Sequence, residues 1–306
     1  MADDTGDISE LSRRLERGQF TITAELVPPV SSDPADLVRR ALPLKGLATA
    51  VNVTDGAGAR VHLSSLAAAR ILVEQGVEPI LQMTCRDRNR LALQGDLLGA
   101  LAFGVRNLLV VTGDDPKTGD QPDAKPVFDL DSTRLLALAH RLGSEHRLAS
   151  GAPVHGPTAL YLGGAALPLD PPAGWIAADL AAKADAGARF VQTQFCMDAG
   201  VVRRWVARLT ELGLIPRLKV LIGVAPLASA RSARWMRERL YGTIIPDAVI
   251  ARLEHSPDPR REGIAICTEL LHELAAIPGV AGAHIMAPAH PDAIPETIAA
   301  FTAAGQ

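Results

Sequence analysis

Val110-Val111-Thr112-Gly113-Asp114-Asp115-Pro116 joins an apolar run of β-forming residues to an acidic turn. An apolar strand that ends in carboxylates is typical of a parallel strand in an α/β enzyme, where the carboxyl end of the strand faces the active site. Asp and Pro are also ordinary turn residues, so Asp114 and Asp115 can equally serve to end the strand. This stretch therefore predicts a strand and leaves the role of its aspartates to the rest of the chain.

The composition limits the classes of protein to which the 306 residues can belong. A hydrophobic content of 48% allows a large core, in one barrel or in two smaller domains. The net charge of -3 and the absence of a long basic run argue against a nucleic-acid partner. No apolar run reaches the ~20 residues of a membrane helix, and the polar N-terminus is not a signal peptide. Three widely spaced cysteines without a CxxC pair favour a reducing cytoplasm.

Short β-rich runs alternate with helical runs along most of the chain. We expect a lead-in helix in residues 1–18 and a single barrel domain over residues 19–306. The expected strands are Phe20–Leu26, Ala50–Thr54, Pro79–Cys85, Leu108–Thr112, Ala159–Gly163, Phe190–Phe195, Leu218–Val224 and Ala281–Met286. The expected helices are Ile8–Gly18, Pro34–Leu44, Ser64–Gln75, Arg90–Phe103, Ser132–Leu142, Trp175–Ala186, Gly200–Leu212, Ala228–Leu240 and a pair over Asp247–Leu274.

Eight strands that alternate with helices predict a (β/α)8 TIM barrel closed by right-handed crossovers. The alternative is an open doubly wound sheet, which needs a glycine-rich fingerprint after an early strand. Asp55-Gly56-Ala57-Gly58-Ala59-Arg60 is the one candidate, and it lacks the third glycine. The barrel is therefore the preferred architecture.

Polar residues at the expected strand ends should converge on one site. Glu25 lies inside the apolar run Ile22–Val27, where burial of an unpaired charge would be costly. It is either paired with an arginine across the barrel or a general acid whose pKa burial raises. Gln192 and Gln194 share one face of their strand, and their amides suit the edge of a heterocycle such as a pterin. They could equally satisfy backbone groups inside the barrel.

Other polar residues have competing explanations. The arginines of Cys85-Arg86-Asp87-Arg88-Asn89-Arg90 can flank a helix start capped by Asp87 or hold a nucleotide's phosphates. We favour the structural role for Arg88 and Arg90 and leave Arg86 open. His284 is better explained as a core histidine than as a catalyst. No zinc-binding histidine spacing occurs, and the acidic turn does not have EF-hand spacing, so we expect no metal.

The chain resembles the methylenetetrahydrofolate reductase family from Phe20 to Met286. The motifs that carry the resemblance are Ala24-Glu25-Leu26-Val27-Pro28-Pro29, Asn52-Val53-Thr54-Asp55-Gly56-Ala57, Gln82-Met83-Thr84-Cys85-Arg86-Asp87, Thr112-Gly113-Asp114-Asp115-Pro116, Asp185-Ala186-Gly187-Ala188 and Gln192-Thr193-Gln194-Phe195. This resemblance implies a role in one-carbon metabolism and methionine biosynthesis. The family reduces 5,10-methylenetetrahydrofolate to 5-methyltetrahydrofolate, usually with FAD taking hydride from NADH or NADPH.

The resemblance also implies roles for individual residues. Glu25 corresponds to the acid that protonates N10 of the folate and opens its five-membered ring to an N5 iminium. Asp114 corresponds to the aspartate close to the pterin and flavin, where its charge would stabilise the developing cation. Gln194 corresponds to the glutamine that hydrogen-bonds the folate, and Gln192 lies beside it. The sequence is compatible with a homo-oligomer but does not define one.

The cofactor positions match the family less well. Thr54, Gln82 and Gly113 correspond to strand-end positions beside the cofactor, and Lys183 is the one lysine of the helix that holds FAD in flavin-binding members. The Tyr-Pro…His-Pro segment of those members is missing from Gly163–Pro172. Either FAD is held differently, or hydride passes directly from NAD(P)H to the iminium.

Two other functions are compatible with a folate-binding or small-molecule barrel. A barrel that binds folate or a related pterin without redox activity, as a partner subunit, would explain the missing flavin signature. A Schiff-base aldolase needs a lysine at a strand end, and Lys219 instead lies near the start of its strand. The reductase is therefore the primary hypothesis and the non-redox subunit the alternative.

Overall fold

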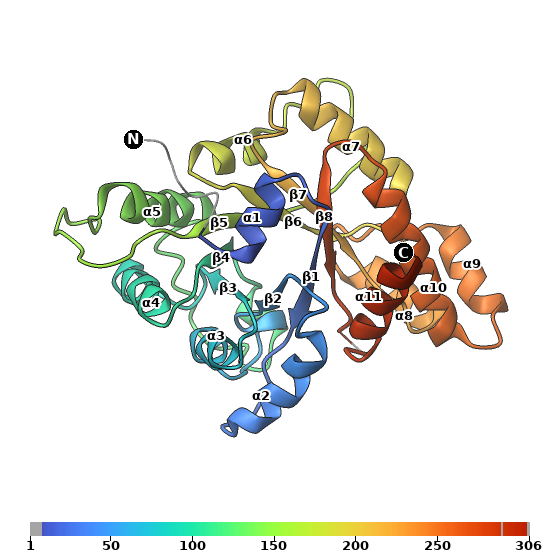
Figure 1. The fold of residues 1–306 in the computed structure, drawn as a ribbon, viewed down its shortest axis with the longest axis horizontal. Helices are drawn as coiled ribbons and strands as arrows, with labels where there is room; N and C mark the ends of the chain where they lie inside the picture. Colours follow the sequence, from blue (N-terminus) through green and yellow to red (C-terminus); the bar gives the residue numbers. More distant parts are fainter. Residues whose placement is uncertain (1–7, 289, 305–306) are drawn as a thin grey trace.

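The computed structural model, which describes residues 8–288 and 290–304, is a closed parallel barrel with strand order β1 to β8 (Figure 1). The strands are β1 (Thr21–Leu26), β2 (Ala50–Val53), β3 (Pro79–Thr84), β4 (Asn107–Val111), β5 (Tyr161–Ala166), β6 (Phe190–Phe195), β7 (Lys219–Val224) and β8 (Val280–Ile285). The predicted single-domain (β/α)8 barrel is confirmed. Residues 1–7 of the expected lead-in segment and residues 305–306 of the expected barrel domain lie outside the described residues.

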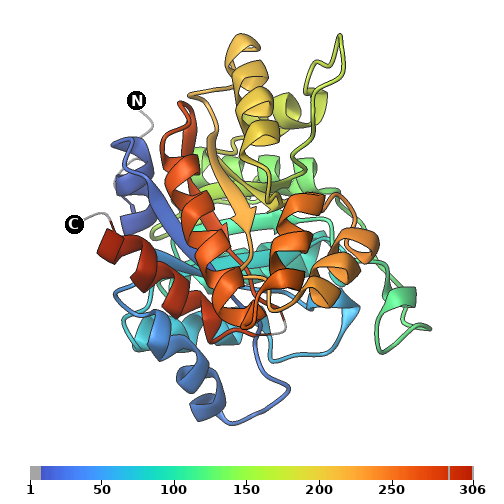
Figure 2. The ribbon, with the colours of Figure 1, turned by 90° about the vertical axis from the view of Figure 1, so that its right-hand side faces the viewer.

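Helices follow the strands around the barrel. They are α1 (Glu10–Glu16), α2 (Pro34–Ala41), α3 (Ser65–Glu74), α4 (Arg90–Ala102), α5 (Ser132–Glu145), α6 (Ala178–Asp185), α7 (Ala199–Glu211), α8 (Ala230–Arg239), α9 (Asp247–His255), α10 (Pro259–Ala275) and α11 (Ala293–Ala304), with 3₁₀ turns η2 (Leu42–Leu44), η3 (Ala57–Ala59) and η4 (Pro116–Thr118). Helices α10 and α11 form the layer outside β1 and β8 (Figure 2, orange and red).

Three elements differ from the sequence prediction. Strand β5 continues to Ala166, beyond the expected end at Gly163. Its small residues have low β propensity, but pairing with β4 and β6 keeps them in the strand. Helix α6 starts at Ala178 because Ala177 has a left-handed backbone with φ of 50°. Helix α11 has no counterpart among the expected helices, since Pro295 and the prolines before the helix indicate a loop. Pro295 is nevertheless tolerated in its first turn.

The lower half of the barrel interior is apolar and closed by α1. Inward side chains of six strands meet Leu11 and Leu15 there; they are Ala50, Ile80, Leu109, Tyr161, Phe190 and Leu221. The rings of Tyr161 and Phe190 stack with centroids 5.3 Å apart. Gly163 makes room for this stack, because a Cβ at that position would lie 2.3 Å from the Phe190 ring.

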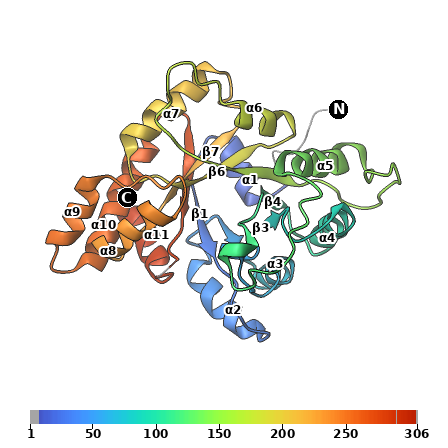
Figure 3. The ribbon, with the colours of Figure 1, turned by 180° about the vertical axis from the view of Figure 1, so that it is seen from behind.

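Helix α1 is held across the amino-terminal end of the barrel (Figure 1). The Glu78 carboxylate accepts hydrogen bonds from the backbone N–H groups of Glu10 and Leu11, at 2.8 and 2.9 Å. These are two of the N–H groups that a helix start leaves without partners. The carboxyl ends of the strands lie at the opposite end of the barrel (Figure 3).

Candidate active site at the carboxyl ends of the strands

Glu25 lies at the carboxyl end of β1, with its side chain directed into the barrel. Thr23, two residues earlier on the same face, contacts His284 on the neighbouring strand β8 inside the barrel. The Glu25 carboxyl group is half-buried, and no described residue forms a hydrogen bond or ion pair with it. Burial raises its pKa from 4.5 to about 7. The alternative of an arginine partner across the barrel is therefore wrong for the described part of the chain.

We expect Glu25→Gln to weaken the pH dependence of folding stability. The folded pKa of about 7 lies above the ordinary 4.5, so the folded chain binds this proton more tightly than the unfolded chain. The wild type should therefore lose stability as pH rises from about 4.5 to about 7, by at most about 3 kcal/mol, and less because the group is partly exposed. Urea unfolding at two pH values tests this. The free energy of unfolding of the variant, relative to that of wild type, should be larger at pH ~8 than at pH ~5. An equal difference in unfolding free energy at both pH values would contradict the assigned pKa.

Gln192 belongs to a buried polar network below Glu25. Its Nε2 donates to Thr23 Oγ1 and to Asn52 Oδ1, both at 3.1 Å, and its Oε1 accepts from Asn52 Nδ2 at 2.5 Å. His284 completes the network through Thr23 Oγ1 at 3.0 Å, and burial lowers the pKa of this imidazole to about 3. The core role expected for His284 is confirmed. The amide of Gln192 is committed to protein partners, so it does not face a ligand directly.

Gln194 lies above this network, and its position depends on a bulge. The pairing of β6 with β7 shifts register between Gln192 and Phe195. Gly223 permits the shift, because a Cβ there would lie 2.2 Å from the Thr193 carbonyl oxygen. The Gln194 amide donates to the Tyr241 carbonyl oxygen at 3.3 Å and accepts from the Phe195 N–H at 3.0 Å. These are local contacts at the rim that a ligand can replace.

Thr54 and Gln82 lie at the ends of neighbouring strands. Thr54 is buried, and its hydroxyl oxygen has no hydrogen-bond partner. An unpaired buried hydroxyl is unusual and suits a site that a ligand completes. Gln82 is half-buried and shares the inward face of β3 with Ile80. Both residues therefore lie at strand ends, as the sequence predicted.

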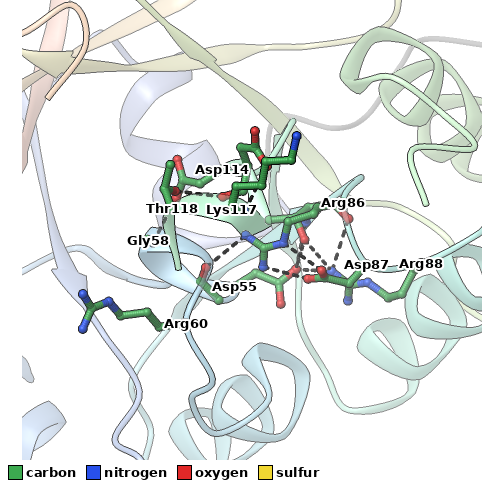
Figure 4. Close-up of polar contacts among 12 residues, drawn as sticks. Asp55, Gly58, Arg60, Arg86, Asp87, Arg88, Asp114, Lys117 and Thr118 are labelled. Carbon is green, nitrogen blue, oxygen red and sulfur yellow. Dashed lines mark hydrogen bonds and ion pairs between the residues drawn. The ribbon is translucent and has the colours of Figure 1, made fainter. Parts of the chain in front are cut away.

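Asp114 is exposed at the end of β4, and its Oδ2 accepts from the Gly58 N–H at 2.9 Å (Figure 4). Asp115 caps η4 through the Lys117 N–H, which is one of the turn roles that the sequence allowed for it. Gly113 has φ of 95°, and a Cβ there would lie 2.9 Å from Arg86 Cβ. Packing under the turn is therefore a sufficient reason for this glycine.

Three arginines follow β3, and each has carboxylate partners. Arg88 binds Asp55 and Asp96, and Arg90 forms a bidentate pair with Asp129, which confirms the structural role expected for these two. Arg86, which was left open, is buried. Its guanidinium donates two 2.7 Å bonds to Asp87 and one of 3.2 Å to the Gly56 carbonyl (Figure 4).

The residues of α6 do not fit the pyrophosphate of FAD. Lys183 is buried, and its ammonium donates to the Ala165 carbonyl at 2.6 Å and to Asp179 at 2.7 Å. The start of the helix has no side-chain cap and follows Ala177. A pyrophosphate needs several charge-assisted donors, whereas α6 supplies one lysine that is already engaged.

The described part of the chain contains no group of three or more His, Cys, Asp or Glu residues that could hold a metal ion. None of its helices is long and apolar enough to cross a membrane. The cysteines Cys85, Cys196 and Cys267 are free and buried.

The fold and site define a barrel protein with a protonatable carboxyl group at the open ends of its strands, an arrangement typical of enzymes that act on small organic molecules. A family model described as methylenetetrahydrofolate reductase matches residues 10–301. The chain belongs to this family, which confirms the resemblance inferred from the sequence.

Individual relatives are more distant. A Caenorhabditis elegans protein named probable methylenetetrahydrofolate reductase (NADPH) is 28% identical over 280 residues, which cover 86% of this chain and 39% of that protein. A Clostridium thermocellum protein that binds two copies of 5-methyl-5,6,7,8-tetrahydrofolic acid superposes with a TM-score of 0.65 at 13% identity, over 96% of this chain and 98% of that one. EDTA monooxygenase from Chelativorans sp. BNC1 superposes with a TM-score of 0.58 at 12% sequence identity, over 93% of each chain. Both structures show the fold alone.

Proposed function

We propose that this chain reduces 5,10-methylenetetrahydrofolate to 5-methyltetrahydrofolate with NADH or NADPH. The observation that carries the proposal is Glu25, a carboxyl group at the open end of the barrel without a protein partner and with a pKa raised to about 7. Such a group holds a proton at neutral pH and can donate it to a bound substrate. The family and the relative named as an NADPH enzyme support this reaction.

Glu25 acts as the general acid. It donates its proton to N10 of the folate as the bond between N10 and the bridging methylene breaks, which leaves an iminium at N5. NADH or NADPH supplies the hydride that converts the methylene carbon to a methyl group. Glu25 is ionised after the transfer and regains a proton from solvent through the open end of the barrel.

Asp114 and Gln194 act on the same substrate. The Asp114 carboxylate lies at the end of β4, where its charge stabilises the cationic iminium. The Gln194 amide exchanges its bond with Tyr241 for bonds to the folate. Gln192 holds β6 in place from below through Asn52 and Thr23, and this indirect role replaces the direct contact inferred from the sequence.

Direct transfer from the nicotinamide, without FAD, agrees best with the engaged Lys183 on α6. Thr54 and Gln82 then border the nicotinamide ring. The buried cysteines agree with a reducing compartment such as the cytoplasm.

We expect the purified protein to form 5-methyltetrahydrofolate from NADH or NADPH without added FAD, and to lack a flavin band in its visible spectrum. The measurement combines the spectrum after incubation with FAD and desalting with product detection by mass spectrometry. A stoichiometric flavin band would contradict the direct transfer. If no product forms with either dinucleotide, with or without FAD, the non-redox folate-binding subunit is the better description.

A further inference from the structure

A cavity of about 270 Å³ lies between the loop after β2 and the loop after β4. Residues that line it include Asp55, Arg60, Arg86, Asp87, Asp120 and Lys125. The two loops touch, because a Cβ on Gly119 would lie 1.8 Å from the Ala59 carbonyl oxygen. The first of its lining residues, Asp55, directly follows Thr54 in the sequence.

The acidic residues that line the cavity all accept hydrogen bonds from the protein. Asp55 accepts from Thr84, Ser65 and Arg88. Asp87 takes both bonds from Arg86, and the Asp120 carboxylate accepts from the Val61 N–H at 3.1 Å. Asp55 and Asp87 are therefore paired with arginines before any ligand binds, while Asp120 is held by a backbone N–H group.

Two of the lining cations are not compensated in this way. Arg60 and Lys125 are both exposed, and neither side chain has a hydrogen-bond or ion-pair partner among the residues that the structure describes. The Arg60 side chain extends away from the Arg86–Asp87 pair (Figure 4). His62, the remaining titratable lining residue, contacts the Arg60 carbonyl oxygen at 3.0 Å. The cavity thus has two free positive charges at its edge.

The loop after β2 also binds anionic oxygens through its backbone. The Gly58 N–H and the Val61 N–H each donate to a carboxylate of the loop after β4, Asp114 and Asp120. Left-handed residues at Gly56 and Gly58, with φ of 63° and 64°, shape this loop. Backbone N–H groups in a glycine-rich turn together with cations are a recurrent arrangement for phosphate binding.

We propose that this cavity binds a phosphate group of the nicotinamide dinucleotide, with Arg60 and Lys125 as its cationic ligands. The inference rests on the proposed function for the identity of the dinucleotide. With the nicotinamide at Thr54, the rest of the molecule extends along the loop after β2 toward Arg60. The group bound there is either the pyrophosphate, which NADH and NADPH share, or the 2′-phosphate of NADPH.

The test compares wild type with Arg60→Ala, Lys125→Ala and the double variant. We expect each single substitution to raise the KM of the dinucleotide about fivefold to fiftyfold, as for loss of one charge-assisted contact, and to leave kcat and the KM of the folate within about threefold. The matched control is Arg147→Ala, which removes an exposed arginine from the α5–β5 connection at the other end of the barrel. This control should change neither KM.

Calorimetric titration with NADH and with NADPH, without folate, gives a readout that does not need turnover. Weaker binding of both dinucleotides assigns the pyrophosphate to the cavity, and weaker binding of NADPH alone assigns the 2′-phosphate. Unchanged binding of both, or a higher KM for the folate instead, overturns the proposal. If wild type binds dinucleotide but forms no methylated product, the proposed function fails while the phosphate site stands.

Discussion

Glu25→Gln should lower kcat for 5-methyltetrahydrofolate formation by about 100-fold to 10,000-fold, the usual contribution of a positioned general acid. Glutamine preserves the size and polarity of the side chain but has no proton to donate to N10. The structure shows no hydrogen bond or ion pair of Glu25 to any described residue, so the substitution breaks no protein contact of that kind. We therefore expect the variant to fold and to bind 5-methyltetrahydrofolate with an affinity within about threefold of wild type.

The pH profile provides the mechanistic readout for this variant. Because the acid form of Glu25 is required, kcat/KM of wild type should fall about tenfold for each pH unit above the pKa of about 7. The residual activity of Glu25→Gln should show no such fall. Steady-state rates between pH ~6 and ~9 measure both curves. Near-normal turnover in the variant, or an unchanged alkaline limb, would rule out Glu25 as the acid.

The two glutamines of β6 should behave in opposite ways when each is replaced by alanine. Gln192→Ala leaves Asn52 and Thr23 without their partner in a closed interior, so we expect the free energy of unfolding to fall by about 2–4 kcal/mol. Gln194→Ala removes contacts at the rim only. Its stability should stay within about 0.5 kcal/mol of wild type, while the KM of the folate rises about tenfold.

Urea denaturation and folate kinetics, measured on both variants, separate the two roles. Each variant serves as the control for the other, because the same residue type is removed from the same strand. A stable Gln192→Ala variant with a raised KM would place Gln192 at the ligand. A destabilised Gln194→Ala variant would make its contact with Tyr241 structural.

Most of the barrel could be predicted from the sequence because its signals are local. Short apolar runs of β-forming residues define the strands, and the motif around Glu25 places a charge inside such a run. Helix α11 could not be predicted in this way, because Pro295 in its first turn and the prolines before it resemble those of a loop. The end of β5 was missed because glycine and alanine have low β propensity, and only the neighbouring strands reveal that Gly163–Ala166 is paired.

The candidate site was predicted less completely, since its geometry depends on contacts between distant residues. Alternation suggested equivalent roles for Gln192 and Gln194, but a bulge opposite Gly223 places them at different depths. In sequence, the Gly56-Ala57-Gly58 loop indicates only an incomplete dinucleotide fingerprint. Its contacts with Asp114 and Asp120, and the free Arg60 beside it, appear only when the loops after β2 and β4 are brought together.

The sequence by itself determined the (β/α)8 architecture, the family and the position of Glu25 at a strand end, because each of these depends on the order of residues along the chain and on short local motifs. Tertiary structure decided which polar groups remain available to a ligand. A buried amide satisfied by Asn52 and one at the rim look the same in sequence, and the difference between them is set by the partners that barrel closure provides.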